Sequence, residues 1–398
     1  MYYGWRVVAG AFISQMFFVG YFSYATSLLT PYLRAEFDVS LEQVMYGMTI
    51  ATLAGLLFSP VAGALVDRMS VRFLMALGSI IFGVGLLLMA RSESIVAYVW
   101  LFGLTMALGN VLANTIPAMA VVSRWFRSNR GRALGIAAIG TSVGGALIPA
   151  LVSAWLEAFG WRMTLDFMAI CVLLLMLPAT VILIRGRPED VGLSSDSPGD
   201  GTEDTADEGV STRQILVNPD FWSMGISLGL TLAAYSAVLA NLAPYAVAGG
   251  HTAAAGSGLI MAVAIMGLVG KLIFGAGADR FNLKFGLWAA QGLAVTAFAL
   301  FAALPGYPLM LLAACCMGLA AGGLLPVWGA MLAKIFGLRS YGLAMGLMTP
   351  LVTLCVMPSF VLVGRLVDAS GTFQLPMLLL AGATVLAAAC LLPLRLRH

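Results

Sequence analysis

The chain has 398 residues, of which 61% are hydrophobic and 10% charged, and its mean hydropathy is +0.97. This composition is far more apolar than that of a soluble globular domain and predicts an all-α integral membrane protein. The formal net charge of +3 gives no reason to expect a nucleic-acid partner, because the basic residues lie near predicted helix ends.

Runs of about 20 apolar residues recur along the chain, as helices that cross a hydrocarbon core roughly 30 Å thick require. No segment shows the alternating pattern of an outer-membrane barrel. Twelve transmembrane helices are predicted, at 7–29, 42–65, 73–90, 95–122, 131–156, 163–184, 219–248, 256–277, 283–303, 307–333, 341–364 and 373–394. The first begins almost at Met1 without the cleavage region of a secretory signal, so we interpret it as a retained span.

The basic residues indicate the orientation. With twelve spans both termini lie on one side, and most of the 21 Lys and Arg residues fall on that side. By the positive-inside rule both termini are expected in the cytoplasm, in a multi-pass protein of the cell inner (plasma) membrane.

Residues 185–218 interrupt the apolar pattern. The stretch from Glu189 to Glu208 mixes acidic residues with Ser, Gly, Pro and Thr, which is too polar to bury a core. We therefore predict an acidic, flexible cytoplasmic linker over 185–218, between an N-terminal six-helix half at 1–184 and a C-terminal half at 219–398.

The two halves resemble each other. GALVDRMSVR at 63–72 and GAGADRFNLK at 275–284 align at a constant offset of 212, and Glu157 and Gly160 find Asp368 and Gly371 at an offset of 211. Parallel six-helix repeats are typical of transporters whose substrate site lies near the membrane midplane, between the halves.

On these features the chain resembles the major facilitator superfamily of secondary transporters. The stretch 63–72 is similar to the signature loop of that family between helices 2 and 3. The resemblance implies a latch that holds the outward-open state, whereas a generic turn with ion pairs is the alternative. The implied latch residues are Asp67, Arg68 and Arg72 and, in the second half, Asp279, Arg280 and Lys284.

A narrower resemblance rests on three further stretches. YYGWRVVAGAFIS at the start, RPEDVGL in the linker and NPDFW before the seventh helix are similar to the monocarboxylate transporter and oxalate/formate antiporter branch. That branch generally carries Arg where this chain has Lys271, and often Asp or Asn where it has Gly267. Lysine keeps the charge but lacks the planar fork that binds a carboxylate in two places.

Lys271 lies in an apolar run, eight residues before Asp279. At 1.5 Å per residue it is about 12 Å from the end of the span, close to the middle of the membrane. Lysine at a helix centre costs roughly 2.5–3.5 kcal/mol, so such residues usually face a cavity and mark a ligand path. We expect Lys271 to bind a monoanionic substrate; a structural lysine that bonds neighbouring helices is the alternative.

Acidic residues are scarce in the predicted spans. Asp166 is the exception, and it is expected to pair locally with Arg162, four residues earlier on the same helix. No mid-span carboxylate is therefore predicted to compete with a substrate anion.

Other polar and aromatic residues are predicted to bind substrate from helices that face the central pathway in this fold. They are Tyr24, Asn110, Asn114, Asn241, Tyr245 and Trp328. In the alternative interpretation, the asparagines only connect neighbouring helices and the tryptophan only packs.

No enzyme activity, metal or cofactor is predicted. GTSVG at 140–144 fits the GxSxG pattern of hydrolases, but it lies inside an apolar helix, so we interpret its glycines as helix-packing residues. The cysteines are interpreted as packing residues, because none has a Cys or His at metal-binding spacing. They are Cys171, Cys315, Cys316, Cys355 and Cys390.

The sequence thus predicts a monomeric carrier of small organic monoanions, with lactate and pyruvate as archetypes. We expect alternating access coupled to protons. The alternatives are an oxalate/formate-type anion exchanger, an exporter of larger organic acids or drugs, and a membrane sensor that does not transport.

Overall fold

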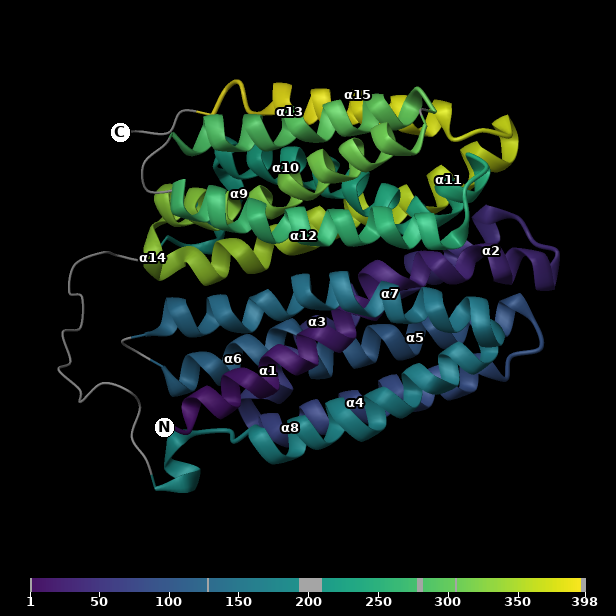
Figure 1. The fold of residues 1–398 in the computed structure, drawn as a ribbon. Helices are drawn as coiled ribbons and strands as arrows, with labels where there is room; N and C mark the ends of the chain where they lie inside the picture. Colours follow the sequence, from purple (N-terminus) through teal and green to yellow (C-terminus); the bar gives the residue numbers. More distant parts are fainter. Residues whose placement is uncertain (1, 127–128, 193–209, 278–281, 305, 395–398) are drawn as a thin grey trace. The chain divides into compact units, whose positions relative to one another are not determined.

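A computed structural model describes residues 2–126, 129–192, 210–277, 282–304 and 306–394 of the chain (Figure 1). All regular secondary structure in these ranges is helical. The chain divides into two compact units, residues 1–200 (unit 1) and 201–398 (unit 2). The predicted all-α membrane fold is confirmed.

Unit 1 consists of long helices, two of which contain a wider π-helical turn. The π-turn η1 joins α1 to α2 without a break, and Gly160, with φ 76° and ψ 173°, divides α7 into two limbs. The elements are α1 Gly4–Val19, η1 Gly20–Ala25, α2 Thr26–Phe37, α3 Leu41–Arg68, α4 Val71–Ala90, α5 Ile95–Ala113, α6 Thr115–Trp125, α7 Arg130–Cys171, η2 Val172–Met176, α8 Leu177–Leu183 and η3 Pro188–Val191.

Unit 2 begins with a short helix and ends with a short apolar one. Gly337, with φ 78° and ψ 159°, divides its longest helix, α14, into two limbs. The elements are α9 Thr212–Val217, α10 Pro219–Ala240, α11 Leu242–Ala248, α12 Ala253–Gly277, α13 Leu283–Ala302, α14 Tyr307–Ser370 and α15 Gln374–Cys390.

In the described residues, ten helical stretches are long and apolar enough to cross a membrane. One of them, Gly131–Leu183, is 53 residues long and is bent at Gly160, so it contains both predicted spans 131–156 and 163–184. The last predicted span corresponds to α15, which is apolar but only 17 residues long. The structure is therefore consistent with twelve crossings.

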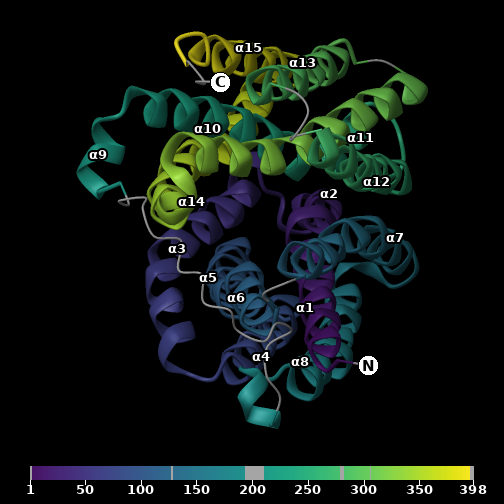
Figure 2. The ribbon, with the colours of Figure 1, turned by 90° about the vertical axis from the view of Figure 1, so that its left-hand side faces the viewer.

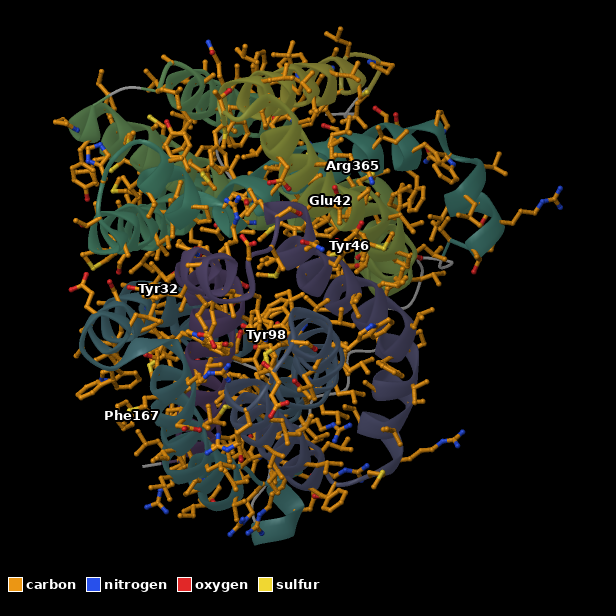
Figure 3. All side chains as sticks on the ribbon, turned by 90° about the vertical axis from the view of Figure 1, so that its right-hand side faces the viewer. Tyr32, Glu42, Tyr46, Tyr98, Phe167 and Arg365 are labelled. Atoms are coloured by element: carbon orange, nitrogen blue, oxygen red, sulfur yellow. The ribbon has the colours of Figure 1, made fainter. Side chains whose placement is uncertain are left out.

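Local side-chain signals set several helix boundaries. Ser40 caps α3 in a capping box with Gln43, and the chain leaves α2 through Asp38 in a left-handed conformation with φ 49°. In the first turns of α3, Tyr46 donates a hydrogen bond of 2.9 Å to Glu42 (Figure 3). The turn between α2 and α3 is thus encoded locally.

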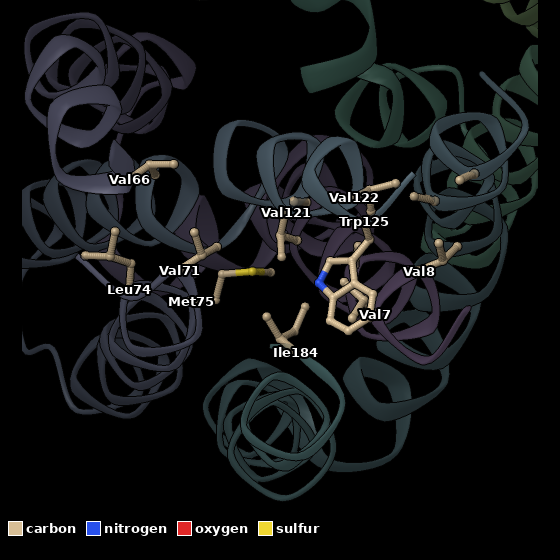
Figure 4. Close-up of a cluster of buried hydrophobic side chains, with 14 of the residues drawn as sticks. Val7, Val8, Val66, Val71, Leu74, Met75, Val121, Val122, Trp125 and Ile184 are labelled. Atoms are coloured by element: carbon tan, nitrogen blue, oxygen red, sulfur yellow. The ribbon is translucent and has the colours of Figure 1, made fainter. Parts of the chain in front are cut away.

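Corresponding positions form the buried core of each unit. In unit 1, α1, α4, α6 and α7 bring together Val71, Trp125 and their neighbours (Figure 4), and Ala133 belongs to the same cluster. Residues about 211 positions later form the core of unit 2, among them Phe336 and Ala344. The sequence repeat is therefore also a repeat of packing.

The helix-packing interpretation of GTSVG is confirmed. A Cβ atom on Gly144 would overlap the carbonyl oxygen of Met16 and lie 2.9 Å from its carbonyl carbon, and a Cβ on Gly140 would overlap the carbonyl of Phe12. The two glycines thus let the backbones of α1 and α7 touch. Gly140 and Gly144 are therefore structural residues of the bundle.

The predicted pairing of Asp166 with Arg162 is wrong. Asp166 accepts a bond of 2.5 Å from Arg91, and Arg162 forms an ion pair of 2.6 Å with Glu36 at the end of α2. Arg162 also donates to the carbonyls of Ala90 and Ser92, at 2.8 and 2.9 Å. Partners from other helices therefore replace the local pair.

Neutralising Glu36 should loosen this end of unit 1. Glu36 accepts from both Arg162 and the Trp161 indole, so Glu36→Gln weakens two contacts between α2 and α7. Both charged groups are partly exposed, so we expect a loss of about 1 kcal/mol and a Tm lowered by on the order of 2–4 °C. Thermal unfolding of the purified protein measures this. Glu93→Gln, at an exposed acid, should leave Tm unchanged. An equal shift in both variants would show that the Glu36 contacts do not hold α2 to α7.

Candidate functional site

Lys271, the predicted anion-binding residue, is half-buried on α12 of unit 2. It lies 18 residues after Ala253 and six before Gly277, the ends of the helix. Six residues correspond to about 9 Å along the axis. Lys271 therefore lies inside the apolar span 253–274, but nearer to one end of α12 than to its middle.

Glycines pack α12 tightly against α14 beside this lysine. A Cβ on Gly322 would lie 2.7 Å from the backbone nitrogen of Lys271, and a Cβ on Gly270 would lie 2.5 Å from the carbonyl oxygen of Leu319. Contacts this short exclude any side chain at either glycine. The backbone from which Lys271 projects is thus held rigidly against α14, which favours a fixed position for the ammonium group.

Asn241 lies at a break between α10 and α11, with φ −112° and ψ 7°. It is fully buried and its Nδ2 donates to the carbonyl of Ala237 at 2.9 Å. The sequence analysis predicts one helix over 219–248, so the break is a correction. A polar residue at a helix break is a common arrangement around a ligand in membrane carriers.

Tyr245 follows one turn later but is surrounded by protein. Its hydroxyl donates to the carbonyl of Phe301 at 2.8 Å, and its ring makes edge contacts with Phe301 and Phe373. The residue is fully buried. The structure thus gives Tyr245 a packing environment and a satisfied hydroxyl.

Trp328 is also part of the core of unit 2. The side chain is 6% exposed, and its indole Nε1 lies 3.2 Å from the sulfur of Met348 on the second limb of α14. The polar atom of Trp328 is therefore directed at a neighbouring side chain.

In unit 1, Tyr24 lies on the π-helical turn η1 and is half-buried. The Ser27 hydroxyl donates to its carbonyl at 3.5 Å, and Thr26 donates to the carbonyls of Tyr21 and Phe22 at 2.8 and 2.9 Å. Single π-turns inside helices are frequent at functional sites. The turn is a feature that apolar periodicity did not indicate.

Asn110 and Asn114 contact each other directly. Asn114 Nδ2 donates to Asn110 Oδ1 at 2.8 Å, as their spacing of four residues predicts. Asn114 itself breaks the helix between α5 and α6, with φ −105° and ψ −129°, where the sequence analysis predicts one helix over 95–122. Each unit thus carries a buried asparagine at a helix break.

Three buried amide oxygens find no hydrogen-bond partner among the described residues. Buried polar groups are normally bonded, so each such atom marks a place for a water molecule or a ligand. They are Asn114 Oδ1, Asn241 Oδ1 and Gln291 Oε1.

Unit 2 also contains a buried polar cluster that was not predicted from the sequence. Gln291 on α13 donates to Ser227 at 2.8 Å and to Thr231 at 3.0 Å, both on α10, and all three side chains are buried. The spacing of Ser227 and Thr231 by one helical turn was the available signal. The cluster ties α10 to α13.

Two of the three latch residues implied for unit 1 have described side chains. Arg68 is exposed at the end of α3, and Arg72 is half-buried in the first turn of α4. Arg124, which the sequence analysis did not include, donates to the carbonyl of Val66 at 3.0 Å. The side chain of Asp67 lies outside the described residues.

In unit 2 only Lys284 of the implied latch is described, because Asp279 and Arg280 lie outside the described residues. Lys284 Nζ donates to the carbonyls of Leu392 and Leu394 at 2.9 and 3.0 Å. Lys284 therefore fastens the start of α13 to the segment after α15.

No group of three or more His, Cys, Asp or Glu side chains in the described part of the chain is arranged to hold a metal ion. All five cysteines are half-buried free thiols.

The family profile described as Major Facilitator Superfamily matches residues 11–302. Human Monocarboxylate transporter 11 is 28% identical over 94% of this chain and 74% of its own length. Rat Monocarboxylate transporter 12 is 24% identical over 96% of this chain and 83% of its own. The fujikurins efflux protein of Gibberella fujikuroi is 30% identical over 47% of this chain and 40% of its own.

Among solved structures, a bacterial homolog of the human lysosomal transporter Spinster, in an inward-facing and unoccupied conformation, is similar with a TM-score of 0.72. It is 16% identical, and the match covers 98% of this chain and 96% of that one. At this identity the likeness shows the fold alone.

Proposed function

Because the chain belongs to the Major Facilitator Superfamily, we propose that it is a secondary active transporter of small organic monoanions such as lactate and pyruvate. The observation that carries the substrate class is the similarity to monocarboxylate transporters, which extends over 94% of the chain rather than over one half. A cationic residue inside a membrane span gives the same substrate class a physical basis.

In the proposed mechanism, protonated Lys271 attracts the substrate carboxylate. A charge in a low-dielectric span is costly, and pairing it with an anion offsets that cost for both groups. The loaded carrier then changes conformation by alternating access, so that the substrate is exposed to the other side of the membrane. The glycine contacts of α12 with α14 support this role, because they fix the backbone that carries the ammonium group.

We further propose Tyr24, Asn110, Asn114 and Asn241 as substrate-binding residues. The carbonyl oxygens of Asn114 and Asn241 are buried acceptors without a described donor, which suits a hydroxyl group on the substrate or a bound water. Tyr245 and Trp328 receive less support, because their polar atoms are engaged within unit 2.

Proton coupling is the second part of the proposal, and uptake into proteoliposomes tests it. If the empty carrier returns with Lys271 neutral, labelled lactate uptake should rise with an inward proton gradient and collapse when an ionophore removes the gradient. Uptake that ignores the gradient but needs an internal anion would instead indicate exchange. A protein that shows no counterflow of labelled lactate, pyruvate or any other monoanion would not be a monoanion carrier.

A second candidate is an exporter of larger organic acids. The similarity to the fujikurins efflux protein favours it, although that match covers less than half of this chain. Competition separates the two: a larger hydrophobic acid that blocks lactate counterflow and is itself transported would favour the exporter.

A further inference from the structure

The short helix α9 immediately precedes a membrane span. It ends at Val217, two residues before α10 begins at Pro219. Its start is fixed by a capping box between Ser211 and Gln214, and Asn218 caps α10 through a bond of 2.9 Å from the backbone nitrogen of Asp220. The segment is thus folded by its own local signals.

One face of α9 is packed on unit 2. Ile215 is fully buried in the core of that unit, and the backbone nitrogen of Val210 donates to the Ser340 hydroxyl at 2.7 Å. The Trp222 indole on α10 donates to the carbonyl of Leu216 at 2.8 Å. These contacts hold α9 against the first turn of the span.

The C-terminal end of α9 carries exposed apolar side chains. Leu216 is 40% exposed and Val217 is 74% exposed. On α10, Trp222 is 44% exposed, and Ile226, one turn further into the span, is 38% exposed. Figure 2 shows α9 at the periphery of its unit, beside the start of α10. An apolar surface therefore continues from the span onto α9.

The position of this surface along the chain fixes its depth. Helix α10 is long and apolar enough to cross a membrane, so its exposed apolar side chains are suited to contact with lipid. Val217 lies two residues before that helix, a position expected at the boundary between hydrocarbon and water. Tryptophan is enriched at this level, where its ring contacts apolar groups and its N–H finds a polar partner.

We propose that Leu216, Val217 and Trp222 form an interface anchor that lies in the bilayer surrounding unit 2. Lipid is the occupant because the surface is continuous with the lipid-facing side of α10. Arg213 lies one turn before Val217 on the same face of α9, and its charged group is directed toward the lipid phosphate groups in this arrangement.

Single cysteines on α9 test the proposal. Glu93, an exposed acid of unit 1 that lies outside the helices, provides the reference position. In proteoliposomes with a charged, membrane-impermeant maleimide on both sides, Leu216→Cys and Val217→Cys should react at least tenfold more slowly than Glu93→Cys. The unmodified protein gives the background from the native cysteines, and all variants should react equally after denaturation.

Two outcomes would overturn the anchor. If Leu216→Cys and Val217→Cys react as fast as Glu93→Cys in the bilayer, water reaches all three positions and the anchor is wrong. Protection that disappears when the protein is diluted to one copy per vesicle means that a second copy covers the surface. A nitroxide on Val217→Cys provides an independent measurement, since it should collide more often with oxygen, which partitions into lipid, than with a water-soluble nickel complex.

Discussion

Replacing Lys271 by glutamine should lower the transport of small monocarboxylates by about 10- to 150-fold. A hydrogen bond to a charged group contributes roughly 1.5–3 kcal/mol, and each 1.4 kcal/mol is a factor of ten in affinity. Glutamine keeps much of the length and can still donate, but it does not attract an anion into the span. Initial rates of labelled lactate uptake at subsaturating concentration measure this loss directly.

Two substitutions control for charge and for location. Lys271→Arg keeps the charge and should retain a large part of the activity, whereas Lys334→Gln, at an exposed lysine on α14, should have no effect. The binding step is followed separately by the rise in Tm that monocarboxylates cause. If monoanions stabilise the Lys271→Gln protein as much as the unmodified protein, Lys271 does not bind the substrate and has a structural role.

The span pattern could be predicted from the sequence because it depends on length and hydropathy alone. The gap predicted between residues 156 and 163 contains Gly160, and the gap between 333 and 341 contains Gly337. Both glycines have a positive φ that other residues rarely adopt. In both gaps the glycine between two apolar runs marks the turn between spans.

Breaks inside the spans could not be predicted in this way. Asn114 and Asn241 each interrupt a continuous apolar stretch, and an isolated asparagine is equally compatible with an intact helix. The break depends on the packing of neighbouring helices, which the local pattern does not contain. The partner of Asp166 could not be predicted for the same reason, because Arg91 is 75 residues away from Asp166 in sequence but next to it in space.

The candidate site was predictable only in part. Lys271 is conspicuous because a charge in an apolar run has few explanations, and the bond between Asn110 and Asn114 follows from their spacing. Tyr245 was selected for its polar hydroxyl, yet the structure directs that hydroxyl to Phe301. Whether a polar side chain within a span faces a pathway or a neighbouring helix depends on tertiary packing.

Gly144→Leu should destabilise unit 1 more than Glu36→Gln does. A Cβ at this position overlaps the Met16 carbonyl, and backbone cannot move aside as a flexible side chain can. Overpacking costs typically about 1–3 kcal/mol, and a backbone clash belongs at or above the upper end. At 3 kcal/mol, Tm should fall by on the order of 6–12 °C. Thermal unfolding and the yield of folded protein report the change.

The repeat supplies matched controls for this prediction. Gly135→Leu on the same helix meets no atom within 4 Å and should be neutral or slightly stabilising. In unit 2 the corresponding close contact has its glycine on the other helix of the pair. A Cβ on Gly229 of α10 would lie 2.8 Å from the sulfur of Cys355 on α14, and Cys355 is the residue 211 positions after Gly144. Gly229→Leu should therefore be milder, and Cys355→Ala should rescue it. A Gly144→Leu protein as stable as Gly135→Leu would show that α1 and α7 can separate at little cost.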